Sequence, residues 1–69
     1  MGFNKRHIDK KTLQSYKQSG LSYLIRTIKS SDCVIIEDKF SEIVFNIINT
    51  NDDKNVIRQK LKDIGFYES

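Results

Sequence analysis

The stretch CVIIEDKFSEIVFNII, residues 33–48, is the densest apolar run in the chain, and its conformation decides the fold. A helix would align the apolar side chains at i, i+3, i+4, i+7 and i+8, which are Phe40, Ile43, Val44, Ile47 and Ile48. Two strands over 33–37 and 42–48 would instead form a hairpin that turns over the four residues DKFS. Because β-branched side chains lose freedom in a helix, we predict the hairpin.

The residues before this run indicate two helices. Asp9 suits a helix N-cap, and Ile8 before it can pack on Leu13. Gly20 fits the left-handed position that follows a helix end. A second helix is predicted by the apolar stripe of Leu21, Leu24, Ile25 and Ile28.

The residues after the run indicate a final helix. Asn51 or Asp52 would cap it, and Asp52 and Asp53 would lie in its first turn, where the helix dipole favours acids. Its buried stripe consists of Ile57, Leu61 and Ile64, after which Gly65 ends the helix and Phe66 and Tyr67 fold back onto the core.

These elements predict one small α+β domain over residues 1–69, in the order α-α-β-β-α with a two-stranded antiparallel hairpin. Residues 1–7 are expected to be flexible. If residues 40–48 are helical, the alternative is an all-α domain of four short helices.

A chain of 69 residues buries only a small core, and its sequence shows few other sources of stability. Cys33 is the only cysteine, so no internal disulfide forms, and we expect this thiol to be buried in a protein of a reducing compartment. Oligomerisation is the remaining common source of stability. The ribbon of the predicted hairpin is also apolar on both faces. We therefore expect a homodimer or an obligate complex with a partner.

The composition bears on origin and location. Residues with AT-rich codons make up 32 of 69, which predicts a low-GC bacterium, its phage or a large DNA virus. The N-terminal stretch MGFNKRHIDKK has no apolar segment typical of a secretory signal, and no apolar run is long enough to span a membrane. We expect a cytoplasmic protein, in the host cytoplasm if it is viral.

Charge is segregated along the chain. Residues 1–29 carry seven basic groups against one acidic group, and aromatic rings such as Tyr16 and Tyr23 are interleaved with them. Such a pattern suits phosphate contacts and base stacking, so this basic region, up to Lys29, is a candidate nucleic-acid interface. The candidate residues are Lys5, Arg6, Lys10, Lys11 and Lys17. A solvated helix face is the alternative interpretation.

Residues 30–53 are acidic and support a competing hypothesis. A hairpin with an acidic rim around an aromatic tip suits a small inhibitor or adaptor that binds another protein. The candidate residues are Glu37, Asp38, Phe40 and Glu42.

No catalytic or cofactor motif is visible. Cys33 would need an activating base, and His7 is the only histidine. The stretch 12–31 is a poor helix-turn-helix match, because Arg26 falls where that motif needs an apolar residue. We therefore predict a small regulatory protein that is not an enzyme and has no cofactor or metal.

Overall fold

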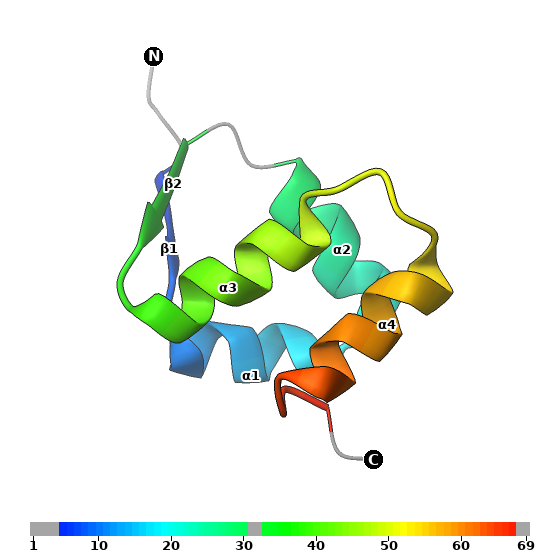
Figure 1. Cartoon of the computed structure of the whole chain (residues 1–69). Coiled ribbons are helices and arrows are strands. Elements are labelled where there is room, and N and C mark those ends of the chain that lie inside the picture. Colours follow the sequence, from blue (N-terminus) through cyan, green and yellow to red (C-terminus); the bar gives the residue numbers. More distant parts are fainter. Residues whose placement is uncertain (1–4, 31–32, 68–69) are drawn as a thin grey trace.

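The computed structural model describes residues 5–30 and 33–67, without the side chains of Lys5 and Cys33. Its elements are β1 (Lys5–Ile8), α1 (Lys10–Gln18), α2 (Leu21–Lys29), β2 (Cys33–Ile36), α3 (Lys39–Ile48) and α4 (Lys54–Asp63) (Figure 1). The protein is a small α+β domain with a two-stranded sheet, as predicted, but the strands are β1 and β2 and they run parallel.

The predicted antiparallel hairpin is wrong, because residues 39–48 form helix α3. Asp38, which we had placed in a turn, is the helix N-cap and accepts a hydrogen bond from the backbone N–H of Ser41 at 2.7 Å. Val44 and Ile48 are fully buried on the inner face, whereas Ile43 is 40% exposed. The helical stripe that we kept as the alternative is therefore the one that forms.

Burial explains why this β-branched segment is helical. Unfavourable helix propensity costs up to about 0.7 kcal/mol per residue, so the isoleucines and valine of α3 lose about 2 kcal/mol together. Full burial of an aliphatic side chain contributes roughly 1.5–3 kcal/mol. The stabilisation from burying Val44 and Ile48 alone exceeds the propensity cost, and the half-buried Phe40 and Ile47 add to it. Tertiary packing therefore outweighs local preference.

Strand β1 was not predicted at all. We expected residues 1–7 to be flexible, yet Lys5, Arg6 and His7 lie in β1; residues 1–4 are outside the described residues. The register pairs His7 with Ile35, and the N–H of Glu37 donates to the carbonyl of Ile8 at 3.0 Å. Parallel strands need a long crossover, which α1 and α2 supply here.

The structure confirms the other three predicted helices. Asp9 caps α1 and accepts a hydrogen bond from the N–H of Thr12 at 2.8 Å. Gly20 has a φ of 105°, which L residues rarely adopt, and it separates α1 from α2. The cap of α4 is Asp53, one or two residues later than predicted, so Asp52 lies in the preceding loop instead of the first turn.

A Schellman motif ends α4. The N–H of Phe66 donates to the carbonyl of Leu61 at 2.9 Å, and that of Gly65 donates to Lys62 at 3.0 Å. Gly65 has a φ of 86°, the conformation that this motif requires. Phe66 is consequently turned onto the core and is 3% exposed, as the sequence predicted.

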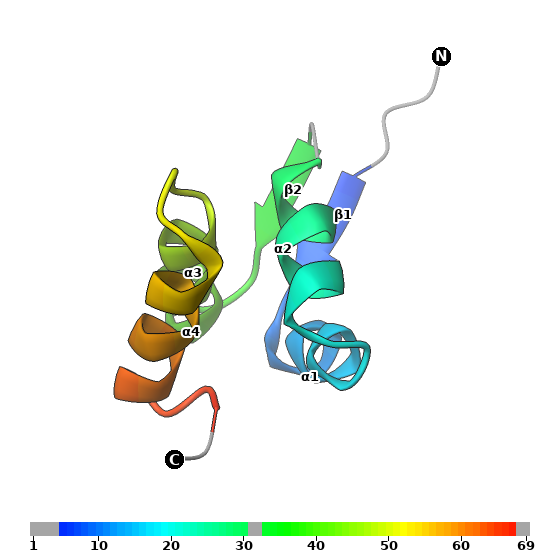
Figure 2. The same cartoon turned by 90° about the vertical axis from the view of Figure 1, so that its right-hand side faces the viewer.

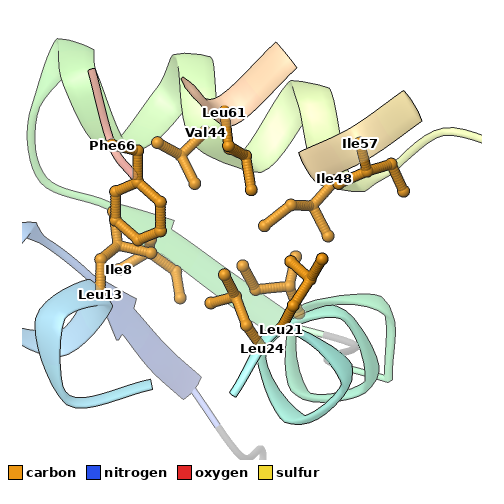
Figure 3. Packing of buried hydrophobic residues seen from close by; sticks show 10 residues of the cluster. Ile8, Leu13, Leu21, Leu24, Val44, Ile48, Ile57, Leu61 and Phe66 are labelled. Carbon is orange, nitrogen blue, oxygen red and sulfur yellow. The ribbon is translucent and has the colours of Figure 1, made fainter. Parts of the chain in front are cut away.

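The elements form two layers around one core. Helices α3 and α4 lie on one side, and the sheet lies with α1 and α2 on the other (Figure 2). The side chains between them are fully or almost fully buried (Figure 3) and come from all parts of the chain: Ile8, Leu13, Leu21, Leu24, Ile28, Val44, Ile48, Ile57, Leu61 and Phe66. The two-faced ribbon, one of our two reasons to expect a homodimer, does not exist.

Candidate functional site

The predicted basic residues at the N-terminal end line neither of the two pockets described below. Arg6 is exposed on β1, and Lys10 and Lys11 are exposed on the first turn of α1. Cations are unfavourable at that end of a helix dipole, and Asp9 compensates for them. The hydrogen bond from Thr12, aided by weaker attraction to nearby cations, holds the pKa of Asp9 below its usual value.

Lys17 has a structural role instead of a solvent-facing one. Its Nζ donates a hydrogen bond to the carbonyl oxygen of Phe66 at 3.1 Å. The ammonium also lies 5.3 Å from the ring centroid of Phe66 and 5.8 Å from that of Tyr67. A cation over an aromatic ring is attracted by the ring quadrupole. Lys17 therefore holds the C-terminal turn against α1 and is occupied there.

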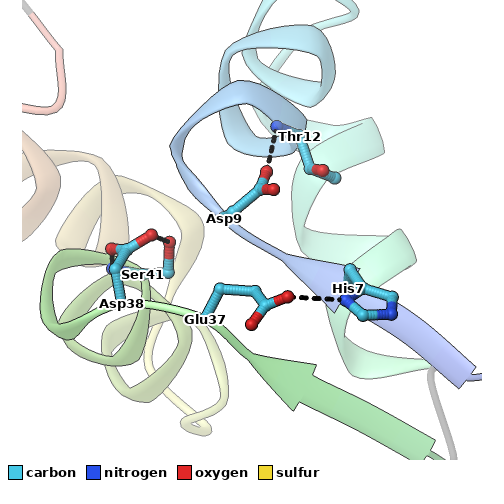
Figure 4. Close-up of polar contacts among 6 residues, drawn as sticks. All are labelled: His7, Asp9, Thr12, Glu37, Asp38 and Ser41. Atoms are coloured by element: carbon cyan, nitrogen blue, oxygen red, sulfur yellow. Dashed lines mark hydrogen bonds and ion pairs between the residues drawn. The ribbon is translucent and has the colours of Figure 1, made fainter.

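The acidic candidates have internal partners (Figure 4). Glu37 Oε1 lies 2.9 Å from His7 Nδ1, which ties the end of β2 to β1. Asp38 caps α3, and its second oxygen accepts a hydrogen bond from the hydroxyl of the buried Ser41 at 3.0 Å. Glu42 forms an exposed ion pair with Lys39 at 3.4 Å. These carboxylates line a shallow depression of about 270 Å³ beside Ile36.

Phe40 does not stand at the tip of a hairpin. It is half-buried in the first turn of α3, with its ring centroid 6.2 Å from that of Phe66. An interface anchor has to reach a pocket of the partner. Phe40 packs against the core of its own chain instead.

Three cations surround a pocket between α2 and α4. The pocket has a volume of about 250 Å³, and its walls carry Arg26 and Lys29 from α2 and Lys54 from α4. Ile25 and Ile57 contribute apolar surface. Figure 2 views the side of the molecule where α2 and the start of α4 lie in front. Packing of the two layers brings Arg26 and Lys54, which are 28 positions apart in sequence, to the same pocket.

Asp52 is the only carboxylate among the pocket's described lining residues. It accepts a hydrogen bond from Lys60 Nζ at 2.9 Å, and this bond and the charge of Lys60 are the main causes that lower its pKa. Lys29 adds a smaller attraction. Asp52 is thus already paired with a lysine outside the pocket.

The cations of the pocket differ in how they are held. Lys54 Nζ donates a hydrogen bond to Ser22 Oγ, which links α4 to α2 across the pocket. Among the described residues, neither Arg26 nor Lys29 forms an ion pair or a side-chain hydrogen bond. Like charges on facing walls repel one another, and an anion between them would relieve that repulsion.

An exposed aromatic ring lies next to these cations. Tyr23, Arg26 and Lys29 follow one another at three-residue spacing, so Arg26 is a neighbour of each of the other two on the surface of α2. Tyr23 is 44% exposed, and its ring contacts Tyr16 edge-on, with the centroids 6.0 Å apart and the planes at 64°. The contact to α1 restricts the ring while leaving part of it open to solvent.

Sequence reasoning noted parts of this site but did not assemble them. Arg26 was counted in the basic region of residues 1–29 and was otherwise noted because it does not fit a helix-turn-helix core. Lys54 belongs to a row with Arg58 and Lys62 at four-residue spacing, which is common on solvated helix faces. No local signal indicates that α2 and α4 face each other, because their approach is set by the tertiary packing.

Comparisons with protein-family models, curated proteins and solved structures find no significant match to this chain. None of the helices in the described part of the chain is long and apolar enough to cross a membrane. The site therefore has to be interpreted from its own geometry and charge.

Proposed function

We propose that this protein is a small, non-enzymatic regulatory protein that binds nucleic acid through the cations around the α2–α4 pocket. The observation that carries the proposal is the convergence of Arg26, Lys29 and Lys54 on one pocket whose only described carboxylate, Asp52, is paired with Lys60. The single cysteine agrees with a reducing cytoplasm as the compartment, either of the cell or of a virus host.

Phosphate is the anion that best suits this arrangement. Arginine donates up to five hydrogen bonds in a fixed plane and lysine provides a compact charge, and both are used in nucleic-acid binding. Binding releases condensed counterions from the nucleic acid, which provides much of the affinity and makes it depend on salt. The net charge of +3 also favours encounter with a polyanion.

The alternative proposal, a protein-binding inhibitor or adaptor, has weaker support. Its residues Glu37, Asp38, Phe40 and Glu42 are in contact with other groups of the same chain. A partner would have to displace these contacts or use the exposed remainder of each side chain. Homodimer formation remains a proposal as well, based on the small core and on the unpaired edges of the two-stranded sheet.

Oligonucleotide binding at different salt concentrations tests the nucleic-acid proposal. Labelled mixed-sequence oligonucleotides should bind at about 50 mM salt and weaken steeply towards about 200 mM, as measured by fluorescence anisotropy. The double variant Arg26→Gln/Lys29→Gln should weaken binding and reduce the slope of log K against log salt by about 1.4–1.8, since each lost phosphate contact contributes about 0.7–0.9.

The matched control is Lys10→Gln/Lys11→Gln, which removes the same charge from exposed positions at the start of α1, outside the lining of the pocket. It should reduce affinity much less than the α2 variant. Equal losses of affinity in both variants would indicate that the interface is a diffuse positive surface instead of the pocket. Failure to retain any oligonucleotide at about 50 mM salt would end the proposal.

A further inference from the structure

We infer that the α2–α4 pocket takes one nucleotide unit of a single strand, with its phosphodiester between Arg26, Lys29 and Lys54 and its base stacked on Tyr23. The inference rests on the proposed function and deepens it by naming single-stranded nucleic acid as the ligand class.

The size of the pocket suits one unit of a chain. Its volume of about 250 Å³ lies below the roughly 300–1,000 Å³ of pockets that enclose whole drug-sized ligands. A phosphate with part of its sugar fits such a space, while the base has to lie outside. Tyr23 and Lys29 are six positions apart, which corresponds to about 9 Å along the helix axis and about 120° around it. Arg26 lies midway between them, so a strand that passes Arg26 can place a phosphate near Lys29 and a base on Tyr23.

The shape favours a flexible strand over a duplex. The cations come from two helices, Arg26 and Lys29 from α2 and Lys54 from α4, and the Lys54 ammonium reaches Ser22 across the pocket. A phosphate of a duplex lies on a convex backbone, and its bases are stacked and unavailable to a tyrosine ring. A single strand can turn one phosphate inward and one base outward. Sequence-tolerant binding of single strands commonly combines a basic groove with such aromatic platforms.

Tyr23 has the position and exposure of a stacking platform. It is 44% exposed, lies next to Arg26 on α2, and is restrained by the edge-on contact with Tyr16. A restrained ring loses little conformational entropy when a base stacks on it. Loss of one aromatic stacking partner lowers affinity by about 5- to 150-fold.

The lining of the pocket attracts a phosphodiester in spite of Asp52. With three cations and this carboxylate, the lining carries a net charge of about two positive units. A phosphodiester carries one negative charge and is therefore attracted to it. The hydrogen bond from Lys60 holds Asp52 in place beside the pocket.

The test uses a labelled single strand of about 12 nucleotides and a hairpin duplex of related sequence, with anisotropy measured over a salt series. The protein should bind the single strand more tightly than the duplex at equal salt. Tyr23→Leu keeps an apolar contact for Tyr16 and a good helix former, so the fold should persist. It should weaken single-strand binding by about 5- to 150-fold with an unchanged salt slope, while Tyr23→Phe stays within about twofold of the wild type.

A purely structural role of Tyr23 would change affinity and thermal stability together, and would not leave the salt slope intact. The inference is overturned if the duplex binds as tightly as the single strand, or if Tyr23→Leu has no effect; the proposed function survives both outcomes. Competition by inorganic phosphate at equal ionic strength would also overturn it, since that result assigns the pocket to the free anion. Absence of binding to either oligonucleotide overturns the inference and the proposed function together.

Discussion

Truncation of Ile48 to alanine should destabilise the domain strongly, whereas truncation of Ile43 should not. Ile48 is fully buried in α3, and the change removes three carbons. At about 0.8 kcal/mol per buried carbon, the transfer cost is about 2.4 kcal/mol, and the cavity raises the total into the range of about 2–5 kcal/mol. Ile43 loses the same atoms but is already 40% exposed. Its transfer cost is about 1.4 kcal/mol, and the better helix propensity of alanine offsets about 0.4 kcal/mol of it.

Urea unfolding followed by circular dichroism measures both effects. A chain of 69 residues has a stability of about 3–10 kcal/mol, so Ile48→Ala should remove a large share of it. The melting temperature should fall by at least about 10 °C for Ile48→Ala and by only a few degrees for Ile43→Ala. A two-faced hairpin would bury both side chains and make the two losses alike. Equal losses would therefore refute the helical register of α3.

Three further predictions concern local contacts. Asp38→Ala should cost about 1–3 kcal/mol in urea unfolding because it removes the α3 cap, whereas Asp38→Asn should retain most of the stability; similar losses would argue against capping. Lys17→Met should cost about 1–2 kcal/mol through the lost bond to the C-terminal turn, and Lys10→Met should cost almost nothing; equal effects would contradict this role. The pKa of Asp9 is lowered in the folded state by the N–H of Thr12, so its stabilisation is present above the ordinary value of 3.8 and disappears as the pH falls through the lowered pKa. Asp9→Asn should flatten that acidic part of the stability profile, and an unchanged profile would contradict the assignment.

Elements whose signals are local were predicted well from the sequence. The cap at Asp9, the helix end at Gly20 and the C-terminal turn at Gly65 each depend on a backbone conformation that few residue types satisfy. The apolar stripe of α2 has the helical period and no competing strand pattern. These features explain why α1, α2 and α4 are found where we expected them.

Elements that depend on distant partners were not predictable in this way. In α3, the sequence does contain a usable signal, since Asp38 precedes an apolar stripe of helical period; β-branched content led us to give it too little weight. Strand β1 has only one β-branched residue, Ile8, and it becomes a strand through its pairing with β2. The candidate site could not be predicted for the same reason, because its cations on α2 and α4 meet only in the packed fold.

An amide chemical-shift titration tests the central claim most directly. Protein labelled with ¹⁵N would be titrated with an unlabelled mixed-sequence single strand at about 50 mM salt, and the shifted backbone amides would be mapped onto the fold. Binding at the α2–α4 pocket predicts the largest shifts within residues 22–29 and 50–57, which surround Arg26, Lys29 and Lys54. Shifts confined to residues 5–11 or 36–42, or no shifts at all, would contradict it.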